Sequence, residues 1–157
     1  MRSLINNSLI CILFIGICTA CNYQHKVYHS YQSLPAKGWS KSDTLLYDIP
    51  VTDSVPTTWH IYAEIRNKSY YPYQNLYLFV SNNLLDSATW KNDTIELALT
   101  YSNGKWRGAG WTSLFQTEAF IGSVVTSHPG KYSVRIAHGM KDEVLMGLND
   151  IGIRIEK

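Results

Sequence analysis

Apolar and polar residues alternate in short runs along most of the chain. The clearest run is Trp59 to Arg66, where Trp59, Ile61, Ala63 and Ile65 alternate with residues that tolerate water. A period of two predicts a β-strand with one buried and one wet face. Similar runs predict further strands at 27–32, 44–49, 94–100, 131–137 and 151–155.

Three segments depart from this simple alternation. Residues 75–81 are apolar on both faces, which predicts a central strand that is covered on both sides. Residues 82–92 contain many turn-forming side chains and are expected to form a loop, with Leu84, Leu85 and Trp90 capping the core. Residues 111–125 fit either a strand or a helical turn.

Seven or eight short strands of this spacing predict an all-β fold, a single antiparallel β-sandwich over residues 27–157. The composition agrees, since the chain has 11 tyrosines and 5 tryptophans, and aromatic residues favour strands. Both a jelly-roll and an Ig-like strand order are compatible with the pattern, and the wide loops favour the jelly roll. Three glycines within 104–110 predict unusual torsions or a close approach of the backbone.

The N-terminus carries a short apolar run at residues 9–17, followed by Thr19, Ala20 and Cys21. The run is shorter than the roughly 20 apolar residues that span a bilayer, and its position is typical of a secretory signal. Small residues directly before a cysteine favour a lipoprotein signal peptide over residues 1–20. It would be cleaved between Ala20 and Cys21, and Cys21 would carry the lipid. A non-cleaved membrane anchor, or a signal peptide cut elsewhere, is the alternative.

Lipidation of Cys21 has consequences for the rest of the chain. Cys11 and Cys18 would leave with the leader, so the mature body of 157 − 20 = 137 residues would have no free thiol and no disulfide. Residues 21–26 form a short lipidated tether, which predicts a domain close to the membrane. Asn22 follows the cysteine and no acidic cluster follows it, a pattern that favours the periplasmic face of an outer membrane.

Charge and motif content point away from several function classes. The 14 basic and 12 acidic residues are nearly balanced, so no nucleic-acid partner is expected. No nucleophile-elbow motif surrounds a serine, and we expect neither a cofactor nor a catalytic group. Glu64 and Glu96 lie on predicted strands and could pair as in a glycosidase, although isolated charges on a wet face are the favoured interpretation. Metal-ligand spacing is absent from the five histidines, His25, His29, His60, His128 and His138.

An aromatic cluster, Tyr70-Tyr71-Pro72-Tyr73, is the most interesting candidate surface. Exposed aromatic residues can stack on sugar rings or form hot spots for a protein partner. The alternative is that Pro72 stiffens a turn and the tyrosines fold back over the core edge. The full candidate surface comprises Arg66, Asn67, Tyr70, Tyr71, Tyr73 and Trp106.

Several of these residues belong to a wider pattern. It includes Arg66-Asn67, Tyr71-Pro72-Tyr73, Asn75-Leu76, the glycine-rich 104–110 segment around Trp106, and the tail from Met140 to Lys157. In this pattern the chain resembles the gliding-motility lipoprotein GldH family of the Bacteroidota. The resemblance implies a membrane lipoprotein that serves, with other lipoproteins, in cell gliding and the secretion linked to it. It implies no catalytic activity, ligand or cofactor.

Two hypotheses follow. In the first, the protein is a non-enzymatic assembly component, held at the membrane through Cys21, that docks other envelope lipoproteins of the motility and secretion machinery. In the second, it is a glycan-binding β-sandwich module that uses Tyr70, Tyr71, Tyr73 and Trp106 as a stacking surface.

Overall fold

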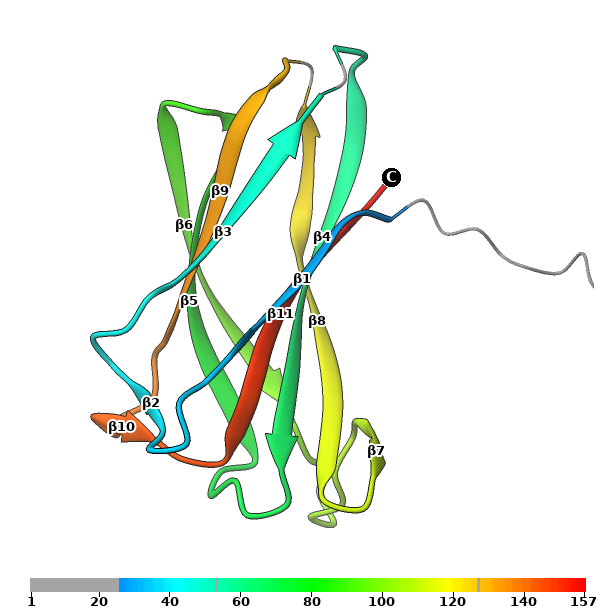
Figure 1. Ribbon diagram of the computed structural model, residues 1–157. Helices are drawn as coiled ribbons and strands as arrows, with labels where there is room; N and C mark the ends of the chain where they lie inside the picture. The colour runs from blue at the N-terminus through cyan, green and yellow to red at the C-terminus, as the bar shows by residue number, and fades with distance from the viewer. Residues whose placement is uncertain (1–25, 53, 127) are drawn as a thin grey trace, which may run out of the picture.

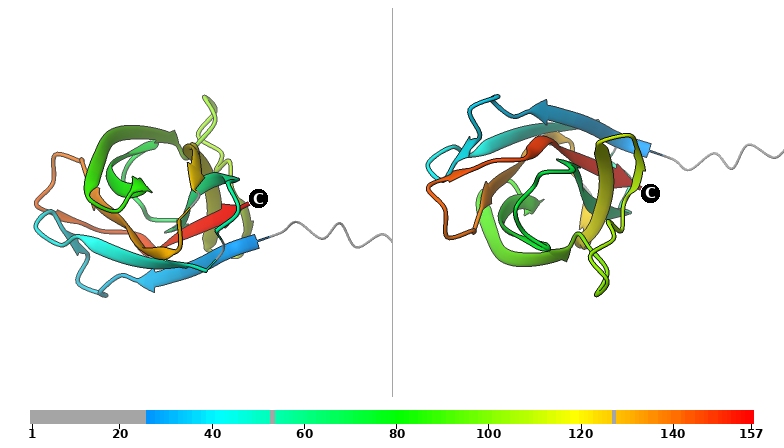
Figure 2. Two further views of the ribbon diagram at one scale, coloured as in Figure 1. Left: turned by 90° about the horizontal axis from the view of Figure 1, so that it is seen from above. Right: turned by 90° about the horizontal axis from the view of Figure 1, so that it is seen from below.

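The computed structural model describes residues 26–52, 54–126 and 128–157, and this part of the chain is built from β-strands without any helix. Two antiparallel sheets wrap around a common interior (Figures 1 and 2). The five-stranded sheet has the order β1 (Lys26–Ser33), β11 (Leu148–Glu156), β4 (Thr57–Lys68), β8 (Leu114–Thr126) and β7 (Ala109–Trp111). The four-stranded sheet has the order β3 (Leu45–Val51), β9 (Gly130–His138), β5 (Asn75–Asp86) and β6 (Thr89–Ala98). A small sheet pairs β2 (Trp39–Ser40) with β10 (Val144–Leu145).

The strand pairing identifies the jelly-roll order. Leaving the short strands β2, β7 and β10 aside, the first strand pairs with the last, β1 with β11. The next pairs inward are β3 with β9, β4 with β8, and β5 with β6. This is one long antiparallel hairpin rolled into two sheets, the arrangement of a jelly roll and not of an Ig fold. The predicted all-β sandwich is confirmed. Of the two strand orders that the sequence allowed, the structure has the jelly roll, which the wide loops favoured.

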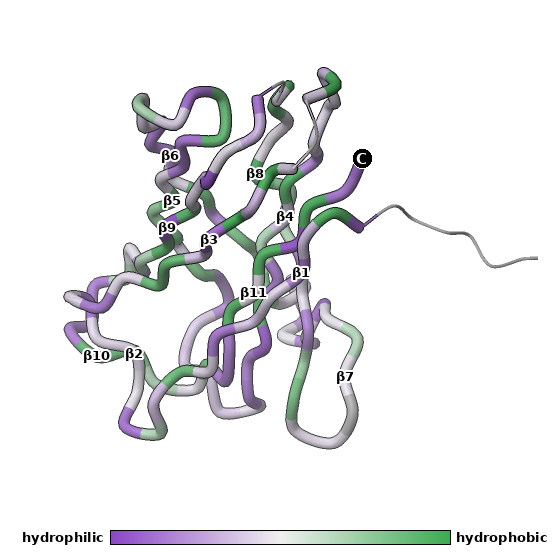
Figure 3. Tube along the Cα trace, turned by 45° about the horizontal axis from the view of Figure 1, so that its top comes forward, coloured by the Kyte–Doolittle hydropathy of each residue, from purple (hydrophilic) through white to green (hydrophobic). Residues whose placement is uncertain are grey.

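Apolar and polar residues alternate along the strands, as the hydropathy-coloured trace shows (Figure 3), and the buried apolar members form the core between the sheets. In β4 the predicted inward residues Trp59, Ile61, Ala63 and Ile65 are all buried. They face inward residues of the opposite sheet such as Leu78, since each sheet turns one apolar face to the other.

Two local predictions were wrong, and one ambiguous segment is settled. Residues 82–92 are not a loop, because β5 continues to Asp86 and β6 begins at Thr89, so the two strands form a hairpin. Nor is β5 covered on both faces. Tyr77 and Phe79 are exposed, because each sheet of a sandwich buries only one face. The ambiguous segment at 111–125 lies mostly in β8.

The strand register gives the molecule two distinct ends. The upper end, as drawn in Figure 1, is where β3, β5 and β8 finish, and the lower end is where β4 finishes at Lys68. Lys26 lies level with Ser123 across the five-stranded sheet, because Lys26 pairs with Glu156, Glu156 with His60, and His60 with Ser123. Measured along the strand direction, Lys26 is therefore about 10 Å below the strand end at Thr126 and about 26 Å above the level of Lys68, at roughly 3.3 Å per residue.

Candidate functional site

The candidate residues lie together at the lower end, but they differ sharply in exposure. Arg66 and Asn67 are close to the end of β4, the tyrosines belong to the connection from β4 to β5, and Trp106 precedes β7. Asn67 is fully buried, and its Nδ2 donates to the Lys68 carbonyl at 3.3 Å. Asn67 is therefore part of the support under the loop and offers no surface to a partner.

Two of the three tyrosines fold back towards the core. Tyr71 is only 4% exposed, and its hydroxyl donates to the Asn75 carbonyl at 3.0 Å. The ring of Tyr73 packs edge-on against that of Tyr71 at 5.9 Å, and its hydroxyl donates to Asp142 Oδ2 at 2.7 Å. Burial raises the pKa of the Tyr71 hydroxyl above its ordinary range, so the group stays a neutral donor. These two side chains hold the loop against the sandwich.

Gly147 explains why this loop and the C-terminal tail fit together. It has a φ of +86°, and a Cβ at this position would lie 2.6 Å from the Cα of Tyr71. Its carbonyl accepts a hydrogen bond from the Lys68 amide at 2.7 Å. Only glycine combines this left-handed torsion with so close a backbone approach. The Tyr71-Pro72-Tyr73 loop and the tail from Met140, two of the segments that carry the family resemblance, are thus packed against each other.

Trp106 and its glycines also form a packed structure. The indole stacks on the Phe115 ring at 5.5 Å between centroids, with an angle of 26° between the planes. A Cβ on Gly108 would lie 2.3 Å from the Gln116 carbonyl oxygen, and one on Gly110 would meet the ring of Phe115. The predicted close approach of the backbone is confirmed, and it brings this loop onto β8.

Exposed aromatic and basic side chains remain at the lower end. Tyr70 is 61% exposed with the Lys68 ammonium 5.7 Å from its ring centroid. Tyr101 is also exposed, and the Arg107 guanidinium lies 4.7 Å from its ring. The segments 68–75 and 99–113 contain three cations, Lys68, Lys105 and Arg107, and no acidic residue. We call these five residues the lower-end patch: Lys68, Tyr70, Tyr101, Lys105 and Arg107.

Sequence reasoning missed Tyr101 and Arg107 as members of this surface. Tyr101 directly precedes the Ser102-Asn103-Gly104 turn, and an aromatic residue at a turn is a weak sign of exposure. Arg66, which was predicted, faces elsewhere. Its guanidinium lies 3.9 Å from the Tyr31 ring centroid, and its Nε donates to Gln116 Oε1 at 2.9 Å. Arg66 therefore belongs to the outer face of the five-stranded sheet.

That outer face carries an ion network that the sequence did not reveal. The buried Arg154 side chain contacts three carboxylates: Nε and Nη2 donate to Glu64 Oε1 and Glu118 Oε2, each at 2.6 Å, and Nη1 pairs with Glu156. Glu64 also accepts a hydrogen bond from Tyr31, and its Oε2 lies 2.8 Å from Nε2 of His29. Burial alone would raise the pKa of Glu64, but the hydrogen bonds from Tyr31, His29 and Arg154 outweigh it and lower the pKa.

The disfavoured pairing of Glu64 with Glu96 does not occur, and the favoured interpretation of isolated charges on a wet face is wrong for Glu64, which is buried in this network. Glu64 lies on β4 of one sheet and Glu96 on β6 of the other, where Glu96 accepts a hydrogen bond from Asn75 Nδ2 at 2.7 Å. Glu64 instead lies directly across from Glu118, and Arg154 bridges the two like charges. Arg154 occupies Oε1 of Glu64, and Tyr31 and His29 occupy Oε2, so both carboxylate oxygens are fixed in place.

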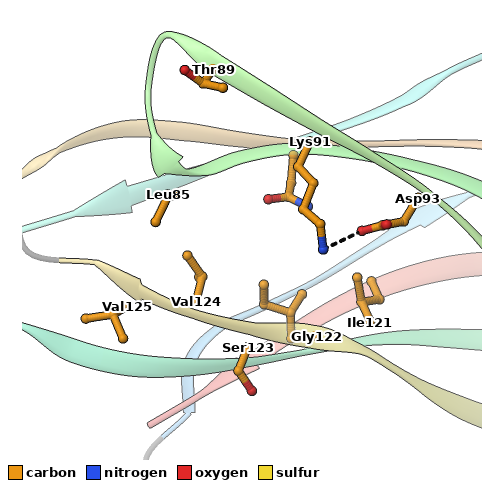
Figure 4. A pocket seen from close by; sticks show the side chains of 11 residues that line it. Leu85, Thr89, Lys91, Asp93, Ile121, Gly122, Ser123, Val124 and Val125 are labelled. Carbon is orange, nitrogen blue, oxygen red and sulfur yellow. Dashed lines mark ion pairs between the residues drawn. The ribbon is translucent and has the colours of Figure 1, made fainter.

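A mainly apolar cavity of about 290 Å³ opens between β8 and the β5–β6 hairpin (Figure 4). Ile61, Ile121 and Val124 are among its lining residues. Leu85 and Val125 lie at the end of the cavity nearest the turn between β5 and β6, at the left in Figure 4. An ion pair between Lys91 Nζ and Asp93 Oδ2, 2.9 Å apart, forms part of the rim. The cavity is therefore suited to apolar groups.

Neither a metal site nor a membrane-spanning helix occurs in the described part of the chain. Within residues 26–52, 54–126 and 128–157, no three His, Cys, Asp or Glu side chains come together in a way that would hold a metal ion. His138 is buried with its ring 5.3 Å from that of Trp39, and burial lowers its pKa. The described part of the chain also contains no helix that could cross a bilayer. Ala20 and Cys21, the predicted cleavage and lipidation residues, lie outside the described residues.

The strand order defines the class of this protein as a jelly-roll β-sandwich. Its exposed features are the loops at the two ends, the outer sheet faces and the cavity between β8 and the β5–β6 hairpin. The GldH lipoprotein family model matches residues 26–155, so the chain belongs to this family. The gliding motility lipoprotein GldH of Flavobacterium johnsoniae is 29% identical over 160 residues, covering 98% of both chains. The GldH homolog of Christiangramia forsetii is 28% identical, covering 94% of this chain and 93% of its own.

Among solved structures, the dimeric latent PorU of Porphyromonas gingivalis is similar to 88% of this chain and is matched over 14% of its own length. The sequence identity is 9% and the TM-score 0.37. A likeness at this level carries no functional argument.

Proposed function

We propose that this protein is a lipid-anchored, non-enzymatic component of the gliding-motility machinery and its associated secretion system in the cell envelope. The observation that carries the proposal is membership of the GldH family over residues 26–155, together with nearly full-length relatives that are named gliding motility lipoproteins. Its role is to assemble or stabilise other envelope proteins of that machinery.

Anchoring is proposed to occur through lipid on Cys21 after removal of residues 1–20. The support is the short apolar run before Thr19-Ala20-Cys21 and the family's designation as lipoproteins. Two or three acyl chains hold a protein durably on a bilayer, whereas one chain binds only marginally. The favoured location is the periplasmic face of the outer membrane, because Asn22 and not aspartate follows the cysteine.

The lower-end patch is the proposed docking surface. Cys21 precedes Lys26 by five residues, which span at most about 18 Å when fully extended. The lower end is about 26 Å below Lys26, so a sandwich standing upright on its tether presents this end away from the membrane. Exposed tyrosines beside cations favour a partner with an acidic surface, because tyrosine and arginine are common anchors at protein interfaces.

A glycan-binding role receives less support from the geometry. Of the four aromatic residues in that hypothesis, Tyr71 is buried, Tyr73 is bonded to Asp142, and Trp106 is stacked on Phe115. Of these four, Tyr70 alone has a largely exposed ring, and one ring is a poor platform for a sugar chain.

Cross-linking in cells that make the full chain tests the docking proposal. Lys105→Glu should reduce recovery of envelope lipoproteins and impair surface spreading and secretion, because it reverses a charge in the patch. Arg135→Glu is the matched control, since Arg135 is also exposed but lies in the middle of β9, away from both ends of the sandwich. Equal partner recovery with both variants would contradict docking at the lower end.

The anchor is tested separately by Cys21→Ala, with alkyne-palmitate labelling as the readout. We expect the wild-type protein to be labelled and the variant to be unlabelled and displaced from the membrane. Labelling that persists in the variant, or normal secretion by cells that make only the variant, would contradict this part of the proposal.

A further inference from the structure

Three exposed aliphatic side chains gather at the upper end of the sandwich. Leu85 is 72% exposed near the end of β5, Val55 is 69% exposed just before β4, and Val125 is 53% exposed near the end of β8. The β8 and β4 ends are neighbours, since Thr126 pairs with Thr57. Figure 4 shows Leu85 on the β5 side and Val125 on the β8 side, both at the same end of the cavity. Several water-exposed aliphatic groups at one end of the molecule indicate a contact surface.

We propose that this upper tip, made by Val55, Leu85 and Val125, rests in the interfacial region of the bilayer that holds the protein's own lipid. The inference deepens the proposed function, because it depends on a lipid at Cys21. It goes beyond that function by assigning a face of the folded body to the membrane.

Tether length selects the bilayer as the occupant. Lys26 is about 10 Å below the strand end at Thr126, and the tether to Cys21 reaches at most about 18 Å, so the tip lies within reach of the membrane surface. At about 26 Å from Lys26, the lower end reaches the same surface only if the molecule lies on its side.

A side-on orientation is opposed by the charges on the sheet face nearest the tether. That face carries Arg154 with its carboxylate partners Glu64, Glu118 and Glu156. Placing these groups against hydrocarbon is costly, whereas aliphatic side chains at the tip lose unfavourable water contact on entering the interface.

The cavity beside the tip fits the same orientation. Its apolar surface comes from aliphatic side chains of β4, β5 and β8, including Leu85 and Val125, whereas Thr89, Lys91 and Asp93 of β6 form a polar side. An acyl chain of a membrane phospholipid would find an apolar surface there without leaving the bilayer.

Depth-dependent fluorescence quenching tests the proposal. The mature protein would contain no free thiol, so Leu85→Cys introduces a unique site for an environment-sensitive dye in the full-length lipoprotein, purified from membranes and reconstituted in phosphatidylethanolamine–phosphatidylglycerol vesicles. Tyr70→Cys is the matched control, because Tyr70 is similarly exposed but belongs to the lower end. We expect lipids that carry a nitroxide to quench the dye several-fold more at position 85 than at position 70.

Three outcomes would decide the matter. Equal quenching at both positions would overturn the upright orientation, and no quenching at 85 would overturn contact of the tip. Binding of a protein at 85 in place of lipid, seen as cross-linking in cells together with an unquenched dye in vesicles, would also overturn it. The mass of the N-terminal peptide is measured on the same sample. A peptide without lipid contradicts the anchor, whereas a lipidated peptide with an unquenched dye contradicts the tip alone.

Discussion

Arg154 Nε donates to Glu64 Oε1 at 2.6 Å and so connects the last strand, β11, with β4 across 90 positions of sequence. Both side chains are buried on the outer face of the five-stranded sheet, where burial of a lone charge is unfavourable. Each of the two buried charges is therefore compensated by the other, and removing one leaves the other without its counter-charge. It also neutralises the repulsion that Glu64 and Glu118 would exert on each other as cross-strand neighbours.

Removing one partner should destabilise the fold in proportion to its burial. Glu64→Gln leaves Arg154 without its buried counter-charge, and we expect a loss of about 2–3 kcal/mol in the free energy of unfolding. Glu118→Gln is a matched control, because Glu118 also accepts from Arg154 at 2.6 Å but its side chain is 58% exposed, against 4% for Glu64. We expect less than about 1 kcal/mol for the control. Urea unfolding at pH 7 measures both, and equal losses would contradict the assigned roles.

Acid should weaken the protein in two steps, which differ in the group that titrates. His138 has a pKa lowered by burial, so the unfolded chain takes up this proton more readily than the folded one. Its contribution is complete above the ordinary value of 6.5 and declines as the pH falls below it. Glu64 has a lowered pKa for a different reason, its hydrogen bonds, and its contribution declines only below the ordinary value of 4.5.

The two steps are separated by measuring the free energy of unfolding at closely spaced pH values, from about 7.5 to about 3.5. This range brackets the ordinary pKa values of both groups. His138→Phe should abolish the decline that begins below the ordinary value of 6.5 and leave the decline below 4.5 in place. A variant whose stability still falls over the upper interval would show that another group titrates there.

Gly147 and Gly104 provide a test of backbone fit. Both have positive φ, +86° and +79°, but a Cβ at Gly147 would lie 2.6 Å from the Tyr71 Cα, whereas none of the described atoms lies within 4 Å of a Cβ at Gly104. Gly104→Ala should therefore cost only the left-handed torsion, about 1 kcal/mol. Gly147→Ala adds displacement of the Tyr71 backbone, and we expect at least about 3 kcal/mol in total. Thermal and urea unfolding of the pair measure the difference, and similar losses would contradict the clash.

Much of the fold was predictable because the alternation within a single strand shows which of its faces is buried. The alternation at Trp59 to Arg66 needs no knowledge of the partner strand, since the inward face is apolar whichever sheet lies opposite. The hairpin at 82–92 was missed because Asn83 resembles a turn residue. In the structure its Oδ1 accepts from the Ser133 amide at 2.6 Å, and Nδ2 donates to the Ser87 carbonyl at 2.9 Å. A partner 50 positions away satisfies the side chain, and no local pattern shows it.

The candidate site was predictable in place but not in detail. Tyrosines around Pro72 were recognised as core-edge or surface groups, and the sequence left both possibilities open. Which ring points inward depends on where the segment before β11 passes, because Gly147 and Asp142 meet Tyr71 and Tyr73 only after folding. For the same reason the ion network around Arg154 was not foreseen, since its members come from strands β4, β8 and β11.

Tyr70 and Tyr71 are sequence neighbours with opposite environments, and this contrast separates docking from stability. Tyr71→Ala removes a buried ring and its hydrogen bond to Asn75, so we expect a loss of about 3–5 kcal/mol in the free energy of unfolding. Tyr70→Ala removes an exposed ring, so stability should stay within about 0.5 kcal/mol of the wild type. If the lower-end patch docks a partner, Tyr70→Ala should nevertheless lower the recovery of cross-linked envelope proteins and slow surface spreading, because exposed tyrosines supply rigid apolar contact area at interfaces. A stable Tyr70→Ala protein with full partner recovery would remove this tyrosine from the docking surface, and an unstable one would show that its ring belongs to the core edge after all.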